Sequence, residues 1–140
     1  QSQNVAEHSF HVIWIALWVA ARLPDPHSQL IDEHQLVMHA MLHDNDEAIT
    51  GDIPSPSKEC HIKKNTPLLN TIVKIADTLE ASLFLHEEMA LGNTTVGPIV
   101  DWVSSVGTEW AAKVGLDYQI LYYELMEQCD PTRHPAMEGV

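Results

Sequence analysis

The sequence carries little positive charge. Its 140 residues include seven Lys and Arg against twenty Asp and Glu, which gives a formal net charge of −13. Non-specific binding to nucleic acid or to an anionic membrane needs a basic surface, so the composition argues against both partners. A small anionic substrate remains compatible with it if positive charge is gathered locally. Four of the seven basic residues do cluster, either as a solvated segment or as an edge that faces a phosphate: Lys58, Lys63, Lys64 and Lys74.

Cysteine and long apolar runs are also scarce. Cys60 and Cys129 are too few for a disulfide framework. The longest apolar run, residues 12–21, is too short to cross a bilayer, and its Trp14 and Trp18 favour a buried helix. The first residues show neither the basic nor the apolar part of a signal peptide, so we expect a cytoplasmic protein. Because the sequence does not begin with Met, we also expect residues upstream of Gln1.

Alternating runs of β-branched residues, which signal strands, are absent, whereas helical periodicity is strong. Ser28 and Thr66 are expected as N-caps, and Gly92 is expected to end the longest helix. We therefore predict an all-α fold, a compact single-domain helical bundle over residues 1–140. The expected helices cover residues 5–22, 28–43, 67–91, 96–114 and 116–128.

Polar residues interrupt the apolar pattern at His8, at His43-Asp44 and at Asp77. His8 shares the stripe of Val5, Val12, Ile15 and Val19, and Asp77 shares the stripe of Val73, Ala81 and Phe84. A buried carboxylate is costly unless it is paired or binds a metal. Two imidazoles and two carboxylates from three helices can converge on one cation.

Each of these residues also has an ordinary structural interpretation. A single inward His is usually a hydrogen-bonded core residue, and Asp44 alone is compatible with a helix-end role. Asp77 is harder to explain in this way, because Asp is rarely buried. His39, one turn before His43, is the alternative ligand, and the other histidines are expected on surfaces or mixed faces.

The order of these residues resembles the H…HD…D signature of HD-domain metal-dependent phosphohydrolases. Three segments are similar to the 5′-deoxynucleotidase branch and to the related phage deoxynucleoside triphosphate hydrolases. An HD dipeptide alone is weak evidence, but three segments in the same order are specific. They are Asn-Val-Ala-Glu-His-Ser at 4–9, His-Asp-Asn-Asp-Glu-Ala-Ile-Thr-Gly-Asp-Ile-Pro-Ser-Pro-Ser-Lys at 43–58 and Lys-Ile-Ala-Asp at 74–77.

The resemblance implies that His8, His43, Asp44 and Asp77 bind a catalytic divalent metal. Such a nitrogen and oxygen ligand set suits Mn, Co, Zn, Fe or Ni better than Mg or Ca. Asp44 is thereby expected to take part in catalysis. The metal would activate a water and polarise the phosphorus centre.

We expect further residues to bind the substrate or to take part in catalysis. Glu47 follows Asp44 by one helical turn and is the expected general acid or base, with Asp46 as the runner-up. Lys58 and Lys74 are expected to hold the phosphate. The resemblance implies that Asp52 accepts a hydrogen bond from the sugar 3′-OH, and the alternative is that Asp52 serves the turn alone.

Two features depart from the family pattern. The family usually has an Arg-Trp pair before the first motif, which this sequence lacks because it begins at Gln1. The stretch from Lys58 to Asp77 is also shorter than expected. Substrate size and base selectivity are therefore left open.

The first hypothesis is a phosphohydrolase that converts a small deoxynucleoside monophosphate to deoxynucleoside and phosphate. The alternative is a triphosphohydrolase that releases triphosphate from a substrate such as dATP. Two further possibilities are a non-catalytic metal-stabilised binding module and a helical interaction domain without metal. The resemblance also leads us to expect a homo-oligomer, and Trp102 and Trp110 could serve either an interface or the core.

Overall fold

The computed structural model describes residues 5–43 and 66–129. These residues form helices and no strand, which confirms the all-α class. No helix in the described ranges combines the length and the apolar character needed to cross a membrane. That the whole chain forms one domain stays a prediction.

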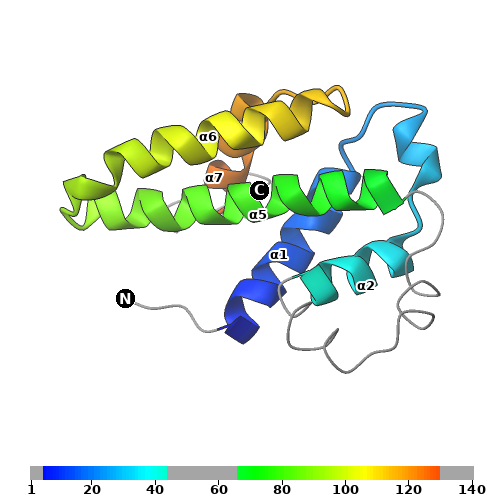
Figure 1. Cartoon of the computed structure of the whole chain (residues 1–140), viewed down its shortest axis with the longest axis horizontal. Coiled ribbons are helices and arrows are strands. Elements are labelled where there is room, and N and C mark those ends of the chain that lie inside the picture. Colours follow the sequence, from blue (N-terminus) through cyan, green and yellow to red (C-terminus); the bar gives the residue numbers. More distant parts are fainter. Residues whose placement is uncertain (1–4, 44–65, 130–140) are drawn as a thin grey trace, which may run out of the picture.

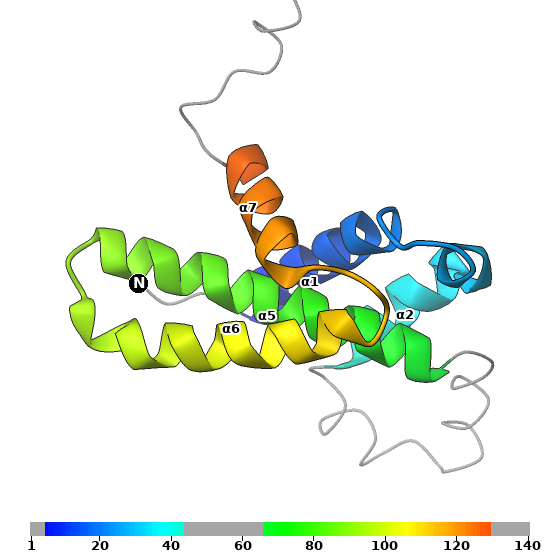
Figure 2. The same ribbon diagram turned by 90° about the horizontal axis from the view of Figure 1, so that it is seen from above.

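The longest helix, α5 (Thr66–Ala90), is the centre of the fold and contacts every other α-helix in the described ranges. Helix α6 (Gly97–Ala112) folds back beside α5, as Figures 1 and 2 both show. In Figure 1, α1 (Val5–Ala20) and α2 (Glu33–His43) lie on the opposite side of α5 from α6. Helix α7 (Tyr118–Cys129) packs against both α5 and α6.

The core forms where these helices meet. It contains Ile15 and Val19 of α1, Leu36 of α2, and Leu79 of α5, all almost fully buried. Burying a side chain of this size contributes about 1.5–3 kcal/mol each. Trp18 packs partly buried against this core, as expected, but Trp14 is 43% exposed. The expectation for Trp14 was wrong because its position, two residues from Val12, falls on the opposite face of α1.

The predicted helix over residues 28–43 is divided. A short 3-10 helix, η1 (His27–Leu30), precedes α2, which begins only at Glu33. The cap is Asp32, whose Oδ1 accepts hydrogen bonds from the backbone N–H groups of His34 at 2.9 Å and Gln35 at 3.4 Å. Ser28 is therefore not the N-cap, and its hydroxyl donates to the carboxylate of Asp25 instead.

The remaining helices differ from the prediction mainly at their ends. Gly92 ends α5 as predicted, with a φ of 100°, and Asn93 N–H donates to the Glu88 carbonyl at 3.0 Å. A 3-10 turn, η2 (Thr94–Val96), leads into α6. Helix α7 begins later than predicted because Asp117 Oδ1 accepts the backbone N–H of Gln119 at 3.0 Å and caps it.

Candidate metal centre

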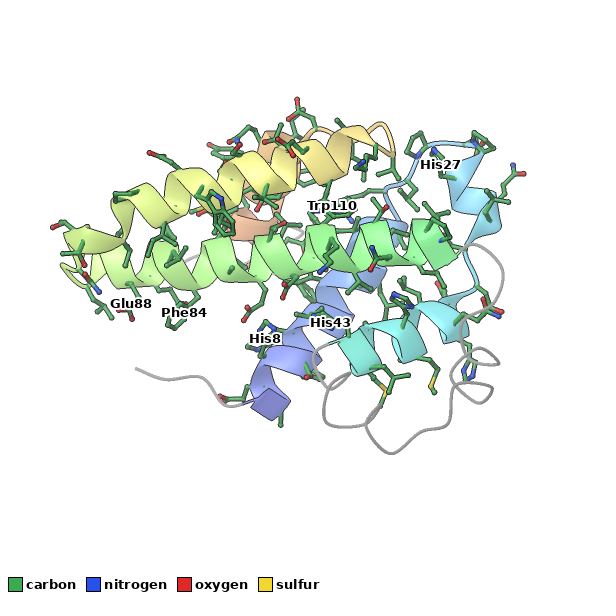
Figure 3. The ribbon with its side chains drawn as sticks, in the orientation of Figure 1. His8, His27, His43, Phe84, Glu88 and Trp110 are labelled. Carbon is green, nitrogen blue, oxygen red and sulfur yellow. The ribbon has the colours of Figure 1, made fainter. Side chains whose placement is uncertain are left out.

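Three polar side chains meet between α1, α2 and α5. One ligand atom from each of His8, His43 and Asp77 lies within 4.8 Å of the other two. His8 Nε2 is 3.2 Å from Asp77 Oδ1, and His43 Nε2 is 3.6 Å from the same oxygen. Figure 3 shows His8 and His43 close together on the α1 and α2 side of α5. The structure thus brings three of the four predicted ligands together, whereas Asp44 lies outside the described residues.

The other ring nitrogen of each histidine is already engaged. His43 Nδ1 is 2.8 Å from the Ala40 carbonyl oxygen, to which it donates. His8 Nδ1 is 2.9 Å from Glu80 Oε1. A donor at Nδ1 leaves a lone pair on Nε2, so both Nε2 atoms can present lone pairs towards Asp77. Three acceptor atoms then face one another, an arrangement that a shared cation or extra protons would stabilise.

Local sequence explains how these three side chains come together. His8 lies one turn before Val12 on the stripe that buries α1. His43 is the last residue of α2, so its ring reaches α5 from the end of a helix. Asp77 follows Val73 by four residues but lies at the edge of the buried stripe, where its side chain is 38% exposed. Asp77 is therefore more accessible than its periodicity indicated, which suits a group open to a ligand.

The electrostatic environment favours the ionised form of Asp77. Burial raises the pKa of the Asp77 carboxyl, but the polar contact with His43 and positive charge on His43, His8 and Lys74 together outweigh it. The net result is a pKa below the ordinary value of 3.8. Asp77 is consequently a carboxylate, the form that binds metals, across the neutral pH range.

Glu80 is a member of this centre that the sequence reasoning missed. Its side chain is only 8% exposed, and besides His8 it faces His11, whose Nδ1 is 3.7 Å from Glu80 Oε2. The spacing held only part of the signal, namely the shared face within each helix and not the contact between the two helices. Glu80 follows Asp77 by three residues and His11 follows His8 by three, so each pair shares a helix face.

The other predicted residues divide into two groups. Lys74 is exposed one turn before Asp77, close enough for its charge to lower the pKa of Asp77. His39, the alternative ligand, is half-buried, and the metal-ligand group found among the described residues does not include it. The remaining predicted residues lie outside the described ranges, and their roles stay predictions: Asp46, Glu47, Asp52 and Lys58.

Comparison with known proteins links this chain to 5′-deoxynucleotidases. The family model for "5′-deoxynucleotidase YfbR-like" proteins matches residues 1–64. A 5′-deoxynucleotidase of Shewanella oneidensis is 30% identical in an alignment 129 positions long, gaps included, that covers 67% of this chain and 66% of that protein. The 5′-deoxynucleotidase yfbR of Photorhabdus temperata is 32% identical over 87 residues, covering 59% of this chain and 44% of the relative.

A third relative, the 5′-deoxynucleotidase VV1113 of Vibrio vulnificus, is 37% identical over 57 residues, or 41% of this chain and 29% of its own length. The chain thus spans 66% or less of the length of each of these relatives. No solved structure gives a significant match. The resemblance to the 5′-deoxynucleotidase branch is confirmed over residues 1–64, which contain the first two of the three segments and match the YfbR-like 5′-deoxynucleotidase family.

Proposed function

We propose that this chain is a metal-dependent 5′-deoxynucleotidase, a phosphate-ester hydrolase that converts a deoxynucleoside monophosphate to deoxynucleoside and phosphate. The observation that carries the proposal is the convergence of His8, His43 and Asp77 from three helices. The names of the curated relatives supply the substrate class. The charge balance of the chain agrees with a small substrate rather than a nucleic acid.

The ligand atoms fit a divalent transition metal. Two imidazole nitrogens and one carboxylate oxygen suit Mn, Co, Zn, Fe or Ni, and the engaged Nδ1 atoms of His8 and His43 hold both rings in place. We assign Asp44 as the fourth ligand, because it follows His43 directly at the end of α2. Coordination positions that the protein does not fill would be open to water and to a phosphate oxygen.

A divalent ion in this centre would lower the pKa of a water molecule and polarise the phosphoryl group. In the reaction, the water oxygen forms a new bond to phosphorus while the bond from phosphorus to the sugar 5′-oxygen breaks. We assign Glu47 to give a proton to that leaving oxygen. Lys74, exposed beside Asp77, is assigned to the phosphate together with Lys58, and Asp52 to the sugar 3′-OH.

The monophosphate is preferred to the triphosphate as substrate because the three relatives described above are named 5′-deoxynucleotidases. Both reactions break the same bond, so their products distinguish them. Incubation with dAMP and with dATP should release phosphate from dAMP. Triphosphate from dATP would favour the triphosphohydrolase instead.

The direct test is phosphate release from each deoxynucleoside monophosphate, with Mn, Co or Zn supplied in turn. We expect His43→Ala to abolish the reaction and His34→Ala, an exposed His on the same helix, to preserve it. Glu47→Ala should keep metal binding but lose turnover. No turnover with any metal would refute the proposal and, if the metal still binds, would favour the non-catalytic binding module. Full activity of His43→Ala would also refute it, and full turnover of Glu47→Ala would exclude Glu47 as the proton donor.

A further inference from the structure

A cavity of about 280 Å³ opens between α5 and α6, and it shares Asp77 with the metal centre. Its α5 side includes Lys74, Asp77 and Ala81, and its α6 side includes Trp102, Val106 and Trp110. Asp77 belongs to both the cavity and the group of metal ligands. A ligand that reaches the metal centre with one end can therefore lie in this cavity with the other.

The α6 wall of the cavity is aromatic. Trp102, Val106 and Trp110 recur every four residues and so share one face of α6. Trp110 packs partly buried against the core, and Figure 3 shows it on the α6 side of α5, away from His8 and His43. Trp102 is 66% exposed, so the core does not explain its position. An exposed indole beside a cavity offers a stacking surface for a flat ring.

Positive charge is gathered at the same place. The structure describes three Lys and Arg residues, Arg22, Lys74 and Lys113. Lys74 lines the cavity, and Lys113 Nζ lies 5.4 Å from the centre of the Trp110 ring. In a chain of net charge −13, one of the three described cations lines the cavity and a second lies near the ring of a Trp that lines it, which favours a ligand that is both aromatic and anionic.

We propose that this cavity holds the base of the nucleotide, with Trp102 stacking on the base and Lys74 directing the phosphate towards Asp77. The identity of the ligand rests on the proposed function, but the aromatic and charged walls of the cavity do not. Since one indole can stack on any base, this arrangement selects for the presence of a base more than for its identity.

The test separates the contribution of the base to binding from that of the phosphate. Calorimetric titration with the four deoxynucleosides, which have a base but no phosphate, measures binding without turnover. Trp102→Ala should weaken nucleoside binding about fivefold or more, the equivalent of ~1 kcal/mol. Trp14→Ala, which removes an exposed Trp from α1, is the matched control and should bind as the wild type does.

Kinetics provide a second readout. Trp102→Ala should raise KM for dAMP but leave KM for deoxyribose 5-phosphate, which has no base, unchanged. Lys74→Gln should raise KM for both compounds, because both carry the phosphate. Circular dichroism of each variant checks that it folds, which the exposure of Trp102 and Lys74 favours.

Three results would overturn the cavity proposal. They are the absence of binding by any deoxynucleoside, an unchanged affinity in Trp102→Ala, and a change in sedimentation of that variant without a change in affinity. The last would identify this face as an interface between copies of the chain. If the wild-type protein releases no phosphate but binds deoxynucleosides in a way that depends on Trp102, the proposed function is refuted and the cavity proposal is supported.

Discussion

The carboxylate of Glu80 on α5 accepts a hydrogen bond of 2.9 Å from Nδ1 of His8 on α1. Glu80 is almost fully buried, and a buried carboxylate needs such a partner. The contact also fixes which ring nitrogen of His8 faces Asp77. Carboxylates commonly orient metal-binding histidines in this way and increase their basicity.

Replacing Glu80 should therefore weaken metal binding. Glu80→Gln keeps the size of the side chain but removes its charge, so we expect Mn²⁺ affinity to fall ~10–100-fold. The Mn²⁺ affinity of Glu80→Ala should fall at least as far, because this substitution also removes the hydrogen bond to His8. Isothermal titration calorimetry of the metal-free protein measures the change.

The matched control is Glu87→Gln, an exposed glutamate further along α5 that should bind metal as the wild type does. Equal affinity in Glu80→Gln and the wild type would mean that Glu80 does not position His8 for a metal.

Metal should stabilise the folded chain through Asp77. A ligand at 100 times its Kd that binds only the folded state adds ~2.7 kcal/mol to the free energy of unfolding. We expect Mn²⁺ to raise the Tm of the wild type but not of Asp77→Asn, whose half-exposed site tolerates an amide. Differential scanning calorimetry with and without metal measures both shifts.

Asp101→Asn on α6 serves as the control, because Asp101 is an exposed carboxylate outside the metal-ligand group. It should keep the full metal-dependent rise in Tm. A rise of the same size in Asp77→Asn would remove Asp77 from the set of ligands.

A side chain at Gly107 should destabilise the fold. A Cβ at this position would overlap Cε1 of Tyr118, whose ring is fully buried. Overpacking of this kind costs ~1–3 kcal/mol or more. Helix propensity returns at most ~1 kcal/mol for Gly→Ala. We therefore expect Gly107→Ala to lower the urea midpoint of unfolding.

Ser105→Ala provides the comparison on the same helix. Ser105 is exposed, so only helix propensity changes, and the stability should rise slightly or stay the same. If Gly107→Ala were as stable as Ser105→Ala, Tyr118 would not pack closely against α6 at Gly107.

Stability should fall in alkaline solution because of Tyr118. Burial raises the pKa of the Tyr118 hydroxyl, although hydrogen bonds to Ser82 and Thr78 act in the opposite direction. As the pH rises past 10.0, the ordinary value for Tyr, the unfolded chain loses this proton first. The unfolded state then binds fewer protons than the native state, so the free energy of unfolding decreases with pH.

Tyr118→Phe removes this titration and the 2.9 Å hydrogen bond with Ser82. The variant should be less stable near pH 8 but lose less stability between pH 9 and 11, as measured by urea unfolding. A residual slope is expected from Tyr122, whose pKa burial also raises. Parallel pH profiles for Tyr118→Phe and the wild type would contradict this account.

Local sequence signals predicted most helices but not their starts. Gly92 ends α5 as expected, because only a residue without a side chain easily adopts its positive φ. The start of α2 was misplaced because Ser28 and Asp32 are both good N-caps. The hydroxyl of Ser28 donates a hydrogen bond to the carboxylate of Asp25 and is not used as a cap, whereas the carboxylate of Asp32 caps α2.

The sequence by itself determined the class of fold and the chemical types gathered at His8, His43 and Asp77, because periodicity and motif order are local properties of the chain. Only the tertiary structure decided which other groups join them. Glu80 meets His8 across 72 positions of sequence, and Trp102 reaches the cavity beside Asp77 because α6 folds back on α5. Such contacts depend on how helices pack against one another, which no local spacing specifies.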